Sequence, residues 1–180
     1  MINKETAADG SYVKYEYWCI SCSGDSWFSA KCTGWGNSGA VVGGVAGGLD
    51  ADELAREIDE IDKINEGLKD FRILKSVEVD ILEDGSLDLP ISILKRLDLR
   101  VCCIHYKFNL PREKQMKRIL TAMDNPYFNI FGHPTAREIN KRPPIDVDMG
   151  KIMDAALERG CYLELNSAPK RLDLNDVHCK

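Results

Sequence analysis

The sequence predicts an α/β protein built from successive βα units around a mainly parallel sheet. Strand-like and helix-like segments alternate with a period of roughly thirty residues, which is typical of βα units. The strand-like segments are nearly continuous apolar runs, as expected for a parallel sheet that is covered on both faces. The chain has 180 residues, of which 44% are hydrophobic and 29% charged, so it is large enough for one domain with a sizeable core.

The first 48 residues differ in composition from the rest of the chain. Eight of the fourteen glycines fall between Gly24 and Gly48, in a stretch without helical or strand periodicity. We therefore expect residues 1–48 to form an atypical, Gly-rich and partly disordered segment, followed by a domain over residues 49–180. Cys19 and Cys22 form a C-x-x-C pair in the first segment, but no second pair follows, so zinc binding there is not favoured.

Four helices and four strands are expected from Asp50 onward. Asp50 is a candidate N-cap, with Glu53 at the capping-box position. Pro111 suits the start of a helix, and Gly160 suits the end of another. The sequence predicts helices over residues 50–68, 89–97, 110–124 and 146–160, and strands over residues 71–82, 99–108, 127–135 and 161–167.

Polar side chains gather toward the carboxyl ends of these strands. Glu78, His105 and His133 lie on the first three strands, and Asn166 lies on the fourth. The carboxyl ends of parallel strands meet at one edge of a sheet, where sites usually form. Two neutral imidazoles and a carboxylate suit zinc, manganese or iron, so the pattern favours a shared metal or polar site. A buried, hydrogen-bonded core histidine is the alternative for each ring.

Other polar residues have simpler expected roles. Asp80 and Glu164 are expected on the opposite face from Glu78 and Asn166, where they would pair with helix cations. Cys102 and Cys103 lie within an apolar strand, so both are expected in the core. Apart from Lys107, the cations clustered after the second strand are expected to form a solvated helix face: Arg112, Lys114, Lys117 and Arg118.

Charge and cysteine content limit the classes of function. The net charge of -5 argues against a protein that coats nucleic acid through bulk charge, although a local basic groove remains compatible with it. No apolar run approaches the roughly 20 residues that span a bilayer, and MINKETAADG has no secretion signal. Seven cysteines, an odd number, then indicate free thiols in a cytoplasmic protein without a membrane partner.

Four segments carry a family resemblance: EVDILEDGSLDLP, CCIHYKFNLPREKQMKRIL, NPYFNIFGHPTAR and YLELNSAPKRLDLNDVHC. Together they resemble the PHP (polymerase and histidinol phosphatase) domain, and in particular that of bacterial and archaeal family X DNA polymerases. The resemblance implies a distorted βα barrel and metal-dependent hydrolysis of phosphoesters. In the polymerase branch it implies a 3′-5′ exonuclease that processes DNA 3′ ends in repair.

The resemblance also implies roles for individual residues. Glu78, His105 and His133 match three of the family's metal ligands, and Mn, Zn or Mg is the expected ion. Asn166 is a further candidate for substrate binding. Lys107 and Arg137 each lie a few residues beyond a candidate ligand, where they could hold a substrate phosphate.

The chain departs from the family pattern at several motifs. The family opens with a strand that ends H-x-H, continues with Thr-Asp-His-Ser and closes with Asp-Ala-His. Here MINKETAADG has no histidine, Cys22 and Ser23 follow YEYWCIS, and the sequence stops at Lys180. We therefore expect an incomplete barrel that lacks the first and last ligand-bearing strands and has little activity alone.

These departures leave three functions open. The first is a fragment of a phosphoesterase that acts on DNA 3′ ends or on a small phosphoester. The second is a degenerate, catalytically inactive scaffold, and the third is a hydrolase like histidinol-phosphate phosphatase. Open sheet edges would also favour self-association of the chain.

Overall fold

The structure is a computed structural model that describes residues 41–42, 50–69 and 72–180. The expected boundary at residue 48 and the pair Cys19 and Cys22 lie outside the described residues. The elements, in chain order, are β1 (Val41–Val42), α1 (Ala51–Glu66), β2 (Ser76–Asp80), α2 (Ile91–Leu94), β3 (Leu99–Cys103), α3 (Arg112–Met123), β4 (Ile130–Phe131), α4 (Met149–Arg159) and β5 (Tyr162–Leu163). From α1 onward, strands and helices alternate in the expected order, whereas β1 lies in the Gly-rich stretch for which no strand was expected.

All strand pairs of the described sheet are parallel. The strand order is β1-β2-β3-β4-β5, so each strand pairs with its neighbours in the chain. In this order β1 and β5 each pair on one side, so the described sheet is open rather than closed into a barrel. The α/β class with parallel strands is therefore confirmed, and the open sheet is consistent with an incomplete barrel.

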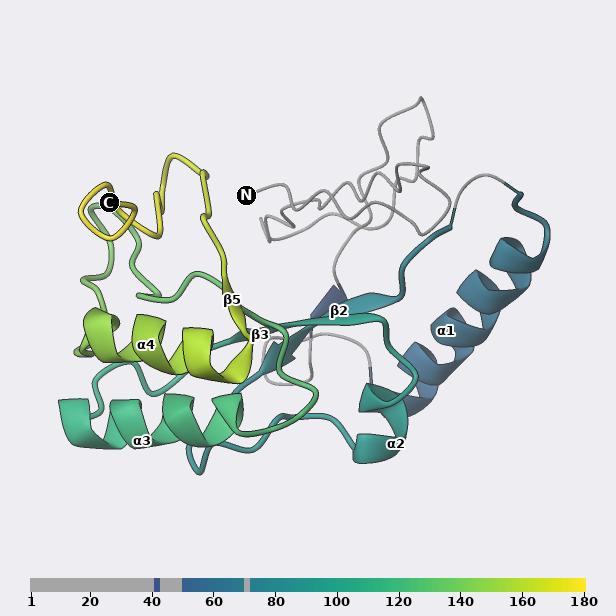
Figure 1. The fold of residues 1–180 in the computed structure, drawn as a ribbon, viewed down its shortest axis with the longest axis horizontal. Coiled ribbons are helices and arrows are strands. Elements are labelled where there is room, and N and C mark those ends of the chain that lie inside the picture. The colour runs from purple at the N-terminus through teal and green to yellow at the C-terminus, as the bar shows by residue number, and fades with distance from the viewer. Residues whose placement is uncertain (1–40, 43–49, 70–71) are drawn as a thin grey trace. The chain divides into compact units, whose positions relative to one another are not determined.

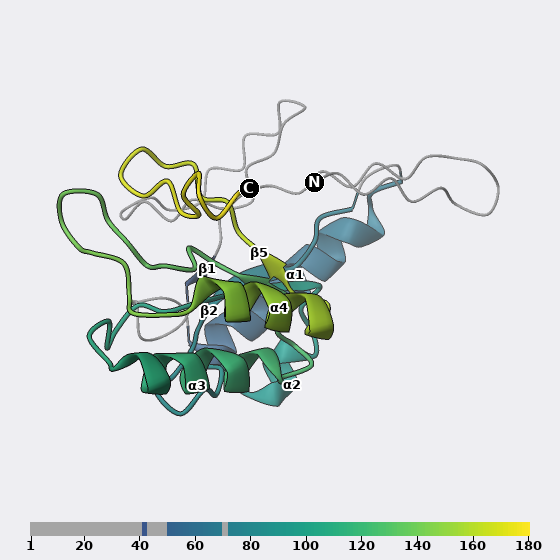
Figure 2. The ribbon, with the colours of Figure 1, turned by 60° about the vertical axis from the view of Figure 1, so that its left-hand side comes forward.

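The two faces of the central strands differ in character. Val77, Val79 and Ile81 belong to the hydrophobic core, whereas Glu78 and Asp80 between them point to the other face. Helices α3 and α4 pack against each other on one side of the sheet (Figures 1 and 2). The sheet therefore has one face that supplies the core and one that can carry polar chemistry.

The predicted helix ends are confirmed at both α1 and α4. The carboxylate of Asp50 accepts hydrogen bonds from the backbone N–H groups of Asp52 (3.0 Å) and Glu53 (2.8 Å), and the side chain of Glu53 accepts one from the N–H of Asp50 (3.1 Å). Such a cap stabilises a helix by about 1 kcal/mol. At the end of α4, Gly160 adopts φ 67°, a left-handed conformation that glycine reaches without a steric penalty.

Strands β4 and β5 are shorter than predicted. In β4 the backbone leaves the strand conformation at His133, which has φ 29°. The next residue, Pro134, has no N–H to donate to a neighbouring strand. The backbone N–H of His133 instead donates to the side chain of Glu164 (2.6 Å). At the end of β4, the backbone N–H thus donates to a side-chain carboxylate rather than to a backbone carbonyl of the neighbouring strand.

Arg118 of α3 is buried, so its expected place on a solvated face is wrong. Its neighbours Lys114 and Lys117 are exposed as expected, but Arg118 is 1% exposed. Its guanidinium donates to the backbone carbonyls of Ile81, Leu82 (2.9 Å) and Tyr106 (3.1 Å). These carbonyls follow β2 and β3 and need partners in the interior, which a single long cation on the adjacent helix supplies.

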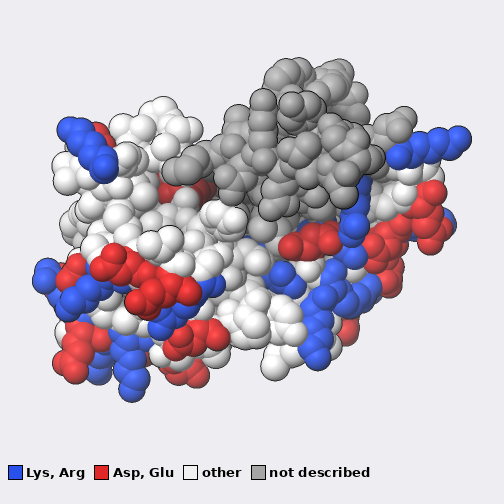
Figure 3. Space-filling model, viewed as in Figure 1, with Lys and Arg blue, Asp and Glu red and all other residues white. Residues whose placement is uncertain are grey.

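On the face shown in Figure 3, positive and negative side chains over the helices are interspersed rather than separated into a basic band. Among the described residues, no helix combines the length and apolar character that crossing a bilayer requires.

Candidate metal centre

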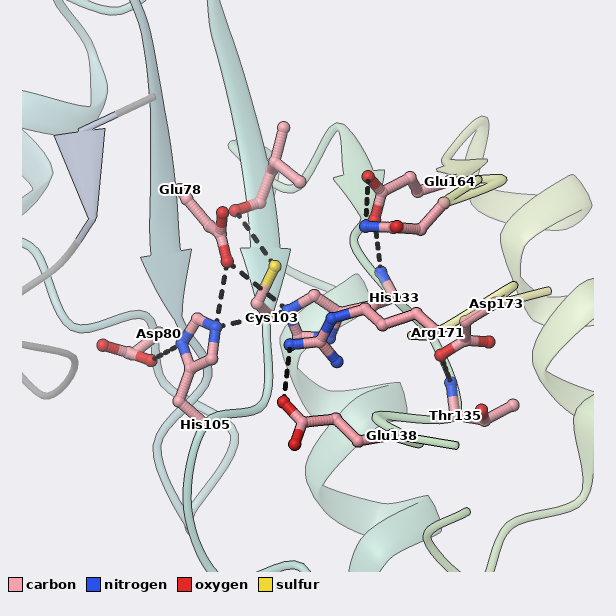
Figure 4. A network of polar contacts seen from close by, with 12 residues as sticks. Glu78, Asp80, Cys103, His105, His133, Thr135, Glu138, Glu164, Arg171 and Asp173 are labelled. Atoms are coloured by element: carbon pink, nitrogen blue, oxygen red, sulfur yellow. Dashed lines mark hydrogen bonds and ion pairs between the residues drawn. The ribbon is translucent and has the colours of Figure 1, made fainter. Parts of the chain in front are cut away.

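Four side chains converge where three adjacent strands end (Figure 4). They are Glu78 of β2, Cys103 at the end of β3, His105 two residues later, and His133 after β4. Each offers one donor atom, and these four atoms all lie within 4.8 Å of one another. The parallel register carries the ends of β2, β3 and β4 to the same edge, which brings together residues that are far apart in the chain.

The spacing of the nitrogen and oxygen donors suits a single ion. Glu78 Oε1 lies 2.9 Å from His105 Nε2 and 3.4 Å from His133 Nε2. The two Nε2 atoms are 3.2 Å apart. Two nitrogen ligands at 2.0–2.1 Å from a tetrahedral zinc are separated by about 3.3 Å. The donor set therefore fits a zinc-like ion with little movement of the side chains.

Asp80 orients His105, and its expected position was wrong. Residues i and i+2 of a strand share a face, so Asp80 lies on the same face as Glu78 rather than opposite to it. Asp80 Oδ1 lies 2.5 Å from His105 Nδ1. A carboxylate on Nδ1 fixes the ring orientation and leaves Nε2 for the ion, an arrangement common at metal-binding histidines.

Glu164 supports the backbone of His133. Its Oε2 accepts the backbone N–H of His133 (2.6 Å), and its Oε1 accepts from the amide of Asn166 (3.2 Å). Asp173 Oδ2 accepts the N–H of Thr135 (3.0 Å), which holds the following turn. Non-glycine residues rarely adopt a positive φ, so these contacts stabilise an unfavourable backbone at His133.

The structure does not bring the predicted substrate residues into this cluster. Lys107 is more than half exposed, with Nζ 3.8 Å from a carboxylate oxygen of Glu83. Arg137 donates to the backbone carbonyl of Arg171 (2.7 Å). Asn166 is 3% exposed and is used by backbone and side-chain hydrogen bonds of its own loop. Their contact with a substrate stays a prediction.

Two members of the immediate surroundings were missed or misassigned from the sequence. Cys102 and Cys103 are both buried as expected, and the sequence analysis missed only that the thiol of Cys103 also faces the cluster. The alternation of strand side chains could have identified Cys103 and Asp80, because each lies two residues from a predicted ligand. Burial and then the neighbouring carboxylate of Glu78 keep the pKa of the Cys103 thiol well above its usual range.

His105 carries a proton in the metal-free cluster at neutral pH. Burial by itself lowers the pKa of His105. Hydrogen bonds to Asp80 and Glu78, together with the charges of both carboxylates, outweigh this effect and raise the pKa to about 9. The imidazolium thus lies between the side chains of Asp80 and Glu78, and an ion that binds here must displace its proton from Nε2.

The raised pKa of His105 predicts that the metal-free chain loses stability as pH rises. The contribution of the imidazolium is fully present below the ordinary histidine pKa of 6.5 and disappears as pH rises through about 9. It amounts to roughly 3 kcal/mol. Urea unfolding in the presence of a chelator, between those two pH values, measures it. A His105→Gln variant should show a flatter pH profile, and equal slopes for the two proteins would contradict the prediction.

Comparisons with known proteins give relatives of two kinds. Over 134 residues the chain is 42% identical to the DNA polymerase/3′-5′ exonuclease PolX of Bacillus subtilis (strain 168). The matched region covers 74% of the chain and 24% of PolX. A probable phosphatase of Thermoanaerobacter sp. (strain X514) is 40% identical over 107 residues, covering 57% of the chain and 41% of that protein. A probable phosphatase of Clostridium acetobutylicum is 32% identical over 110 residues, 59% of the chain and 43% of the relative. No family model matches the chain.

Proposed function

Because the chain is related to the PHP domains of family X DNA polymerases, we propose that it is a metal-dependent phosphoesterase. Glu78, His105 and His133 would hold the ion, which we expect to be Mn, Zn or Mg. The observation that carries the proposal is the convergence of these three donors, with Nε2 and Oε1 atoms 2.9–3.4 Å apart. The chain spans about a quarter of PolX and about two fifths of the phosphatases.

The side chains of the cluster have distinct roles in this proposal. A divalent ion held by these residues would supply Lewis-acid chemistry toward a phosphoester. Glu78 brings a negative charge that offsets part of the charge of the ion. Asp80 holds His105 in the tautomer with Nδ1 protonated, and Glu164 fixes the backbone of His133. Glu78 and His133 are 2% and 4% exposed, so the ion would lie in a site with little competing water.

The names of the relatives suggest two classes of substrate. PolX is named as a 3′-5′ exonuclease, so a DNA 3′ end is the first candidate. The other relatives are named probable phosphatases, so a small phosphoester is the second. Lys107 and Arg137 are the cations proposed to meet a substrate phosphate, with Asn166 as a polar neighbour of the site. Self-association through open sheet edges stays a prediction.

An assay for hydrolysis with two substrates tests the proposal. A 3′-recessed DNA duplex and a chromogenic phosphate ester are incubated with Mn²⁺, Zn²⁺ or Mg²⁺ and the chain, its His133→Ala variant or its His178→Ala variant. His178 is the matched control, because it is the third histidine of the chain and is not part of the cluster. We expect the unmutated chain and the His178 variant to cleave one substrate at similar rates, and the His133 variant to be inactive. Equal rates in all three proteins, or no cleavage with any ion, would contradict it.

A catalytically inactive scaffold is a second candidate, favoured by one observation. The protonated His105 lies within hydrogen-bond distance of both Asp80 and Glu78, so the cluster can be stable without an ion. Metal analysis of the purified chain after dialysis separates the two candidates. Retention of about one Mn or Zn per chain supports the phosphoesterase, and a chain that binds no divalent ion supports the scaffold.

A further inference from the structure

The thiol of Cys103 lies inside the candidate metal centre, beside three nitrogen and oxygen donors. Cys103 is completely buried, and its Sγ is one of the four donor atoms that lie within 4.8 Å of one another. Its neighbour Cys102 belongs to the apolar core on the other face of β3. Two adjacent cysteines of one strand thus face different surroundings, and only the second meets Glu78 and the histidines (Figure 4).

The backbone of the neighbouring strand leaves space for this sulfur. A Cβ atom added to Gly132 would lie 2.3 Å from Cys103 Sγ and 2.7 Å from Val101 Cγ1. Both distances are far below van der Waals contact, so any other residue at position 132 would displace the thiol. The glycine before His133 therefore lets Cys103 and His133 approach the same point from adjacent strands.

We propose that Cys103 is a fourth ligand of the ion and that its sulfur makes the centre prefer zinc over manganese or magnesium. This inference rests on the proposed metal centre. Thiolate is a soft ligand that selects zinc, whereas sites with only carboxylate and carbonyl oxygens suit manganese and magnesium. With Glu78, His105 and His133, Cys103 completes the four ligands of a tetrahedral zinc. The thiol gives up its proton to the solvent when the ion binds.

The geometry requires only a small adjustment of the thiol. For zinc–sulfur and zinc–nitrogen bonds of about 2.3 and 2.0–2.1 Å, a tetrahedral ion separates the sulfur from each nitrogen by about 3.6 Å. The four donor atoms lie within 4.8 Å of one another, so the sulfur and a nitrogen are at most about 1 Å farther apart than a tetrahedral zinc requires. Four protein ligands also leave no position for water. The zinc form should therefore be less active than the manganese form, in which the hard ion does not recruit the sulfur.

Cobalt spectroscopy tests the assignment independently of activity. Co²⁺ is added to the 180-residue chain in which Cys19, Cys22 and Cys32 are replaced by serine, so that these thiols do not contribute. Visible ligand-field bands then report that the ion is bound, and a near-ultraviolet charge-transfer band reports a thiolate ligand. We expect both kinds of band. The Cys103→Ser variant should keep the visible bands and lose the charge-transfer band, and Cys161→Ser should keep both.

The competition between ions gives a second readout. The ratio of the affinity for Zn²⁺ to the affinity for Mn²⁺ should be lower in the Cys103→Ser variant than in the background chain. The decrease should exceed the roughly 10–100-fold loss that follows when a group contacting a metal ligand, rather than the metal, is removed. Visible bands without a charge-transfer band in the background chain would overturn the role of Cys103 and leave the metal centre intact. A charge-transfer band that survives in Cys103→Ser would also overturn it. Absence of all bands would overturn both the ligand and the proposed metal centre.

Discussion

Replacement of Glu78 by glutamine is expected to lower the affinity for Mn²⁺ or Zn²⁺ by well over 100-fold. Loss of a partner outside the ligand set typically costs roughly 10–100-fold, and Glu78 is a proposed ligand. Its Oε1 is also the atom that both Nε2 atoms approach, at 2.9 and 3.4 Å, so its charge is central to the site. Calorimetric titration with each ion measures the affinity, and the hydrolysis assay should show a parallel loss of rate.

The Asp80→Asn variant provides a graded comparison for Glu78. Asp80 contacts Nδ1 of His105 rather than the proposed ion, so its loss should cost roughly 10–100-fold in affinity. The amide conserves size but cannot accept with the strength of a carboxylate. Unchanged metal affinity in the Glu78 variant, or a larger loss in the Asp80 variant, would show that the two roles are assigned the wrong way round.

Replacement of Arg118 by methionine is expected to reduce the free energy of unfolding by about 3 kcal/mol or more. The guanidinium is hydrogen-bonded to the carbonyls of Ile81 and Tyr106, and its carbon lies 4.7 Å from the centre of the Tyr106 ring. Methionine fills much of the volume but leaves buried carbonyls without a donor. Urea unfolding measures the loss, which corresponds to a factor of more than about 100 in the ratio of folded to unfolded chain.

The neighbouring Lys117 supplies the control for Arg118. It lies on the same helix and is exposed, so Lys117→Met should change the free energy of unfolding by about 0.5 kcal/mol or less. Ile81 follows Asp80, and Tyr106 follows His105, so the Arg118 variant should also bind metal more weakly than the Lys117 variant. Equal stability of the two variants would contradict a structural role for the buried cation.

The sequence by itself determined the α/β class, the order of the elements from Asp50 onward and the candidate ligands Glu78, His105 and His133. Helix periods, the Asp50 cap and the left-handed Gly160 depend on interactions within a few residues of one another, so local pattern is sufficient. The meeting of Glu78, His105 and His133 follows from a general rule, because the carboxyl ends of parallel strands share an edge. The face of Asp80 was also determined by the sequence, through the two-residue period of strands.

Only the tertiary structure decided which polar groups become partners across that edge. Asp80 pairs with His105, and Glu164 binds the backbone of His133, through contacts between strands whose register the sequence pattern does not specify. Arg118 belongs to a run of cations, yet it is buried because two carbonyl groups after β2 and one after β3 lie beneath α3. A hydrogen bond between distant segments depends on distances that the packing of strands and helices sets. Local propensity therefore predicts the elements of this protein, while their packing determines the chemistry of its centre.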